Sequence, residues 1–190
     1  SYGELWNPIS WNGNFQNEDH ATFLMQNNIF VACAWDKAIK RELIDARHLR
    51  FVKGQLSEDI EWCSQLLLNI PSVAVLKESI YVYRQQVATS ISVNIGIKNI
   101  QDILEVIKKY AFAEAPVPLL HFLANQYVLL ITNLMRLERS DRAPFDKTIK
   151  SYWWLLDYNW YPYVKRVSKI KFLGYNIVKR LLSIYYRAVR

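Results

Sequence analysis

The second half of the chain carries apolar side chains at helical spacing almost without interruption. One stripe follows the i, i+3, i+4, i+7 recurrence of an amphipathic helix and comprises Ile97, Ile100, Ile103, Leu104 and Ile107. A second apolar stretch covers residues 119–137. Because stripes of this kind must be buried against other elements, the sequence predicts a helical region over residues 94–190.

The first half of the chain is divided into shorter segments. Helix starts, turn residues and β-branched runs predict helices over about 18–28, 36–46 and 57–70, and strands over 29–35, 73–76 and 79–84. Ser57 is a candidate N-cap, and prolines 116, 118 and 144 mark boundaries in the second half. We therefore expect an α+β fold that is mostly helical, with a mixed α/β segment at 1–93 and a helical region at 94–190.

Composition restricts the class of protein. A hydrophobic fraction of 52% excludes general disorder. The two cysteines, Cys33 and Cys63, lack metal-ligand spacing and are expected to be reduced, buried thiols of a cytoplasmic protein. No secretory signal opens the chain, and we expect no bilayer-spanning segment. Because the sequence starts at Ser1, without an initiator Met, we expect a C-terminal portion of a longer protein.

Residues 57–62 (S-E-D-I-E-W) concentrate three acids in four positions. Taken alone, this segment is typical of a capped helix start. Ordered motifs flank it, however: W-D-K-A-I-K-R-E-L at 35–43, L-R-F-V-K-G at 49–54, Y-V-Y-R at 81–84 and T-S-I-S at 89–92. This order closely resembles the acceptor-side half of family 2 glycosyltransferases, the bacterial enzymes that build capsule and other surface polysaccharides.

The resemblance implies that residues 1–93 form the end of a GT-A-like domain, whose N-terminal nucleotide-binding half lies outside this chain. It implies an inverting transferase that moves a sugar from a nucleotide-sugar donor to a saccharide or lipid-linked acceptor. In the family the Asp of the Glu-Asp pair takes the proton of the acceptor hydroxyl, and the matching residue is Asp59. Glu58 would orient neighbouring groups or the acceptor.

Five further residues are expected to bind substrate. Trp35 and Lys37 would flank the acceptor cleft, and Trp62 is also expected to bind substrate. Arg84 and Ser90 belong to a stretch that would close over the donor diphosphate, although Arg84 could instead pair with surface acids. Instead of binding substrate, Trp35 could be a ring of the hydrophobic core, and Lys37 could be a solvated charge on the surface. Ala-Ile at 38–39 departs from the aliphatic–aromatic pair usual in the family.

The metal of this family is not expected in this chain. An Asp-x-Asp motif that holds Mg²⁺ or Mn²⁺ against the diphosphate is absent from the sequence, as are a Gly-rich phosphate loop and a Cys/His cluster. We therefore expect no cofactor here, Mg²⁺ or Mn²⁺ in the full-length enzyme, and no sugar transfer by this chain alone.

Basic residues are concentrated at the C-terminal end. Residues 161–190 hold eight of the 24 Lys and Arg and no acid, which leaves 16 basic against 17 acidic side chains for the rest. One long helix from about residue 163 would place apolar residues on one face and basic residues opposite, although Gly174 weakens it. Such a helix could pack with a solvated basic face, dock on an anionic membrane at the inner face of the plasma membrane, or contact nucleic acid. We expect no nucleic-acid partner, and the alternative to the enzyme is a non-catalytic helical module with a basic membrane- or RNA-binding face.

Overall fold

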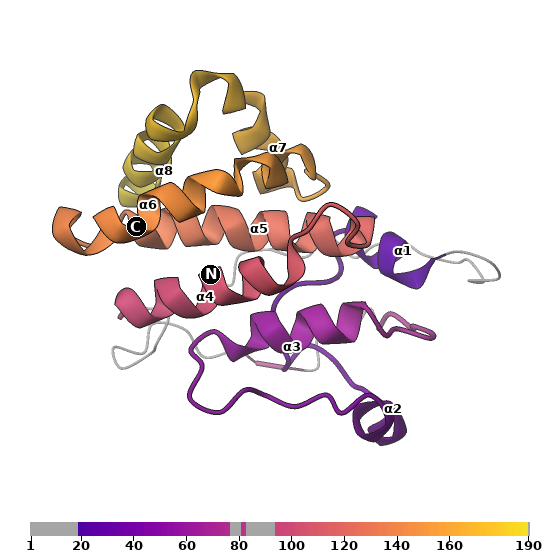
Figure 1. Ribbon diagram of the computed structural model, residues 1–190. Helices are drawn as coiled ribbons and strands as arrows, with labels where there is room; N and C mark the ends of the chain where they lie inside the picture. Colours follow the sequence, from indigo (N-terminus) through magenta and orange to yellow (C-terminus); the bar gives the residue numbers. More distant parts are fainter. Residues whose placement is uncertain (1–18, 77–80, 83–93, 190) are drawn as a thin grey trace.

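The computed structural model describes residues 19–76, 81–82 and 94–189, with side chains up to Tyr185 (Figure 1). Over these residues the chain forms eight α-helices and two short 3-10 helices. Their bounds are α1 His20–Gln26, α2 Arg41–Ala46, α3 Glu58–Leu67, α4 Ile97–Tyr110, α5 Val117–Leu134, α6 Arg139–Ser151, η1 Trp153–Asp157, α7 Pro162–Lys169, η2 Lys171–Leu173 and α8 Tyr175–Val189.

α5 is the central helix of the fold. It packs against α1, α3, α4, α7, α8 and η1, and in Figure 1 it lies between α6 on one side and α4 on the other. Its interior side chains include Phe122, Leu123, Tyr127 and Ile131, all fully buried. Within the described residues this one helix is long and apolar enough to cross a membrane, with a mean hydropathy of 1.3, yet 83% of it is buried. Its apolar run is interrupted by His121, Asn125 and Gln126, and α5 is a core helix of this fold. The expectation of no bilayer-spanning segment stays a prediction.

The mostly helical fold class is confirmed, but the predicted strands are not found among the described residues. Residues 29–35 form a bent, irregular segment, and 73–76 are likewise irregular. Phe30 of the first segment packs on a helix: its ring is buried edge-to-face against Phe122 of α5, with 5.6 Å between centroids. A β-branched run needs a partner strand to form a sheet, and a helix takes that place here. The strand predicted over 79–84 lies mostly outside the described residues.

Polar contacts join the N-terminal part of α3 to the middle and the end of α4. The Leu56 backbone N–H donates to Asp102 at 2.6 Å, just before α3, and one turn into α3 the Glu61 carboxylate binds Lys109 and Tyr110 at the end of α4. Residues on both sides of the expected boundary at 93/94 thus contribute to one hydrophobic core. That boundary stays a prediction.

Ser57 is the N-cap residue of α3 as predicted, but its φ is +58° and its hydroxyl makes no capping hydrogen bond. One local expectation was wrong: Pro144 lies inside α6 and does not mark a boundary. By contrast, the capped start predicted near residue 18 is present, because the Asp19 carboxylate accepts a hydrogen bond from Ala21 N–H at 3.1 Å.

The expected single C-terminal helix is divided into two. α7 ends at Lys169, the chain turns through η2, and α8 begins after Gly174, whose φ of +82° is the left-handed conformation that glycine adopts without strain. The break lets each helix bury its own apolar side: Val164 and Val167 from α7, and Val178 and Leu182 from α8. A straight helix could not direct both sets at the same core.

Candidate active site at the start of α3

The Asp59 carboxyl group lies in the first turn of α3, half-buried against residues 31–37. It accepts a hydrogen bond from the backbone N–H of Ala34, and Glu58, Asp36 and Lys37 are its charged neighbours. Asp59 is therefore neither sealed in the core nor fully solvated.

Burial is the largest influence on this carboxyl group and raises its pKa above the ordinary aspartate value. The negative charges of Glu58 and Asp36 raise the pKa further, while the Ala34 hydrogen bond and the Lys37 charge lower it. The net direction is upward. A carboxylate with a raised pKa is a stronger base near neutral pH than an exposed aspartate.

Lys37 holds the irregular segment in place. Its ammonium group donates to the carbonyl oxygens of Val31 (2.8 Å) and Cys33 (2.6 Å) and to the Asp36 carboxylate (2.6 Å), and its side chain is only 12% exposed. An ammonium group has three N–H bonds, so these contacts use all of them. This geometry favours a structural role, and the expected contact of Lys37 with an acceptor stays a prediction that requires at least one of these bonds to break.

An exposed pair of aromatic rings lies next to the residue that binds Asp59. Trp35 follows Ala34 directly and stacks on Tyr81, with 4.9 Å between ring centroids and 21° between planes. Both side chains are exposed, Trp35 at 41% and Tyr81 at 53%. The fold thus brings residues of three motifs into one region: Trp35, Asp59 and, from the described part of the third motif, Tyr81. The core alternative for Trp35 does not hold.

Of the other three expected substrate residues, only Trp62 is described. Trp62 is buried and stacks on the half-exposed ring of Phe51, with 5.3 Å between centroids. A ligand could reach Phe51 in this arrangement, whereas the Trp62 ring supports it from inside. Arg84 and Ser90 lie outside the described residues.

Glu61 lies on the opposite side of α3 from Asp59, and the sequence predicted no role for it. Its buried carboxylate accepts hydrogen bonds from Lys109 (2.7 Å), Tyr110 (2.8 Å) and Gln65 (3.1 Å). Burial alone would raise the pKa of Glu61, but the three hydrogen bonds outweigh it and hold the pKa below the usual range. Lys109 and Tyr110 follow almost fifty residues later in the sequence, so no local pattern could predict this contact.

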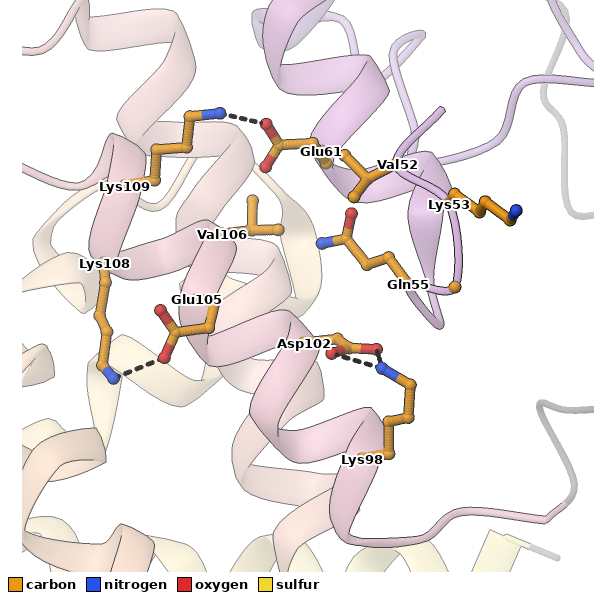
Figure 2. A pocket seen from close by; sticks show the side chains of 11 residues that line it. Val52, Lys53, Gln55, Glu61, Lys98, Asp102, Glu105, Val106, Lys108 and Lys109 are labelled. Carbon is orange, nitrogen blue, oxygen red and sulfur yellow. Dashed lines mark hydrogen bonds and ion pairs between the residues drawn. The ribbon is translucent and has the colours of Figure 1, made fainter. Parts of the chain in front are cut away.

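A cleft of about 550 Å³ opens beside Glu61, between residues 52–55 and α4 (Figure 2). The lysines of α4 that line it each pair with an acid: Lys98 with Asp102, Lys108 with Glu105 and Lys109 with Glu61. The Gln55 side chain extends between the two walls, and its carbonyl oxygen is buried without a hydrogen bond. Since Asp59 is not part of its lining, this cleft is separate from the candidate base.

The acids near Asp59 do not suit a divalent cation. The Lys37 ammonium group already occupies the Asp36 carboxylate at 2.6 Å, and among the described residues no three His, Cys, Asp or Glu side chains lie close enough to hold a metal ion. Nearby Cys33 and Cys63 are free thiols, and burial raises the pKa of Cys63 to about 12, which keeps it protonated. The described site therefore offers a carboxyl base and an aromatic surface.

Compared with known protein-family models, curated proteins and solved structures, the chain shows no significant match.

Proposed function

We propose that this chain is the acceptor-side part of an inverting family 2 glycosyltransferase of bacterial surface-polysaccharide synthesis. Residues 1–93 would complete a GT-A-like domain in the cytoplasm, and the helices after them would form an appendage. The donor nucleotide sugar would be bound mainly by the preceding half, together with Mg²⁺ or Mn²⁺, with Arg84 and Ser90 near the diphosphate.

The observation that carries this proposal is that the Asp59 carboxylate binds the backbone of Ala34, the residue before Trp35, whose exposed ring stacks on Tyr81. Aromatic rings offer a flat apolar surface with a polar edge, which suits the C–H face of a sugar ring. A saccharide stacked on these rings can direct a hydroxyl group toward the Asp59 carboxylate. The order of the motifs is what assigns the role of the base to Asp59 in this arrangement.

The residues of this chain would act on the acceptor. As the acceptor hydroxyl attacks the anomeric carbon of the donor, its proton passes to a carboxylate oxygen of Asp59. The Ala34 N–H keeps that carboxylate in position, and the negative charge of Glu58 helps to raise the Asp59 pKa toward the pH of the reaction.

The test is the substitution Asp59→Asn in the full-length protein. Asparagine has nearly the same shape, and its side-chain oxygen can still accept the Ala34 hydrogen bond, but it cannot take a proton. We expect transfer to fall by about 10²–10⁴-fold while the fold is retained. The matched control is Asp45→Asn on α2, whose side chain is 55% exposed. Unchanged transfer by Asp59→Asn would exclude Asp59 as the base.

The folding state of that variant provides an independent check. Because the pKa of Asp59 is raised in the folded state, its ionised form opposes folding, and this cost is present above the unfolded-state pKa. We therefore expect Asp59→Asn to be at least as stable as the wild type at neutral pH, and the difference to vanish as the pH falls below the unfolded-state pKa. A strongly destabilised variant would mean that Asp59 has a structural role.

The stacked rings give a second test. Trp35→Ala and Tyr81→Ala are each expected to raise KM for the acceptor more than KM for the donor. An equal rise in both constants would argue against an acceptor platform.

A further inference from the structure

α8 has two apolar stripes, and only one of them is buried. Val178 and Leu182 pack into the core, whereas a second stripe on another side of the helix faces solvent. The exposed stripe follows i, i+4, i+7 and i+8 and consists of Ile177, Leu181, Ile184 and Tyr185. A helix that only packs against a core needs one apolar face, so the second stripe calls for a partner.

The turn between α7 and α8 extends this apolar surface. In η2 the Phe172 side chain is 82% exposed, and Leu173 beside it is partly exposed. Gly174 then turns the chain into α8. In Figure 1 this turn is the outermost point of the α7–α8 pair.

A shallow groove shows that α7 and α8 share one surface. It measures about 240 Å³ and is lined from α7 by Tyr163, Arg166 and Val167, from the turn by Ile170, and from α8 by Leu181, Leu182 and Tyr185. Its lining is apolar except for Arg166 and the Tyr hydroxyls. Two members of the exposed stripe, Leu181 and Tyr185, thus lie next to a basic side chain.

The charged side chains that α7, η2 and α8 contribute to this surface are all positive. Residues 161–190 contain no acid. Two lysines here are neutralised by acids of earlier segments, Lys171 by Asp157 and Lys179 by Asp146. The other basic residues with described side chains are exposed and pair with no acid of the described chain: Lys165, Arg166, Lys169 and Arg180.

We propose that the α7–α8 surface docks on an anionic lipid bilayer. The exposed stripe and the Phe172 ring enter the interfacial region, and the four unpaired basic side chains contact lipid headgroups. This inference does not depend on the glycosyltransferase proposal.

Charge and shape favour lipid over other occupants. Two copies of the surface would bring two sets of unpaired cations together, which opposes self-association. RNA would match the cations but leave the aliphatic stripe without a contact. A bilayer interface satisfies both features and needs no shape complementarity.

Docking would leave the candidate active site free. α7 and α8 pack on one side of α5, and α3 packs on the other (Figure 1). The start of α3 would therefore point away from the bilayer surface.

The experiment is co-sedimentation of the protein with vesicles at low salt. We expect retention on phosphatidylcholine vesicles that contain phosphatidylglycerol, weak retention on pure phosphatidylcholine, and release when salt is raised. Sedimentation without vesicles controls for aggregation. Absence of retention on the anionic vesicles would overturn the proposal.

Two pairs of substitutions test the two components of the surface. The double substitution Ile177→Ser/Ile184→Ser is expected to weaken vesicle binding at least about tenfold. The control is Phe112→Ser/Leu129→Ser, which changes two exposed apolar residues, one on the α4–α5 connection and one on α5. If the control pair weakens binding equally, the stripe is not the docking surface.

The second pair removes charge. Arg166→Gln/Arg180→Gln is expected to weaken binding about fivefold per residue, and Arg47→Gln/Arg139→Gln, also exposed, to have little effect. Equal losses in the two pairs would overturn the assignment of these cations to the bilayer.

Two further measurements separate lipid from the rival occupants. Concentration-dependent dimerisation in gel filtration that Ile177→Ser/Ile184→Ser abolishes would identify a second copy as the occupant and overturn the proposal. Binding to homopolymer RNA that exceeds binding to anionic vesicles at equal salt would overturn it as well.

Discussion

Glu61 and Glu105 form ion pairs of the same length, but Glu61 is buried with further hydrogen-bond donors and Glu105 is exposed. The Glu61–Lys109 and Glu105–Lys108 distances are both 2.7 Å. The Glu61 side chain is 5% exposed and also binds the Tyr110 hydroxyl, whereas the Glu105 side chain is 66% exposed. We predict that Glu61→Gln destabilises the fold and that Glu105→Gln does not.

The magnitude follows from what each substitution removes. Glutamine preserves the volume of Glu61 but removes the negative charge that strengthens its hydrogen bonds. The bonds from Tyr110 and Gln65 become neutral, each weaker by about 0.5–1 kcal/mol, and the Lys109 ammonium loses its ion pair. Since Lys109 is 58% exposed, solvent screens its share. A loss of about 1.5 kcal/mol remains, against less than about 0.5 kcal/mol for the exposed Glu105 pair.

The assay is urea unfolding followed by tryptophan fluorescence. For a chain of this size we expect the midpoint of Glu61→Gln to fall by about 0.5 M relative to the wild type. The pKa of Glu61 is lowered in the folded state, so its contribution is present above the unfolded-state pKa and is lost as the pH falls through the folded-state pKa. The difference between wild type and Glu61→Gln should therefore shrink in acid. Equal midpoints for Glu61→Gln and Glu105→Gln at neutral pH would refute the argument that burial sets the strength of this pair.

Two further predictions concern buried groups near α5. His121 stacks on Trp160, with 3.6 Å between centroids, and accepts a hydrogen bond from the Trp160 backbone N–H. Burial lowers the pKa of His121 to about 4. Because the unfolded chain takes up a proton at this residue first, up to about 3 kcal/mol of stability should be lost as the pH falls from about 6.5 to 4. His121→Gln should be less stable at neutral pH but lose less on acidification, and parallel pH profiles for the two proteins would contradict this. Tyr127→Phe removes the buried hydrogen bond from Tyr127 to the Ile149 carbonyl (2.9 Å) and should cost about 1–2 kcal/mol; an unchanged free energy of unfolding would show that this bond contributes nothing net.

Periodic local patterns predicted the helices well. The stripe that starts at Ile97 coincides with α4, and the apolar stretch from residue 119 lies within α5 and the residues that follow it. Both succeed because a helix satisfies its own backbone and shows its buried face at a fixed spacing. The run at 29–35 failed because a buried irregular segment and a strand share the same apolar composition, and a strand also needs a partner that the run itself does not show.

The failures at the C-terminus and at the candidate site have a different origin. Gly174 was recognised as a weak point, but only the packing of Val167 and Val178 into one core shows that the helix breaks there. Asp59 was placed at a helix start, yet the largest cause of its raised pKa is burial in the folded chain, which the local sequence does not show. Lys37 binds backbone carbonyls, and a backbone acceptor leaves no trace in residue identity.

The central position of α5 also affects how the chain must be made. Its neighbours α1, α3 and α4 precede it in sequence, whereas η1, α7 and α8 follow it. During synthesis this uncharged segment therefore leaves the ribosome well before the last helices that will cover it. We expect chaperones to engage the nascent chain at this stage, and truncations that end before α7 to aggregate.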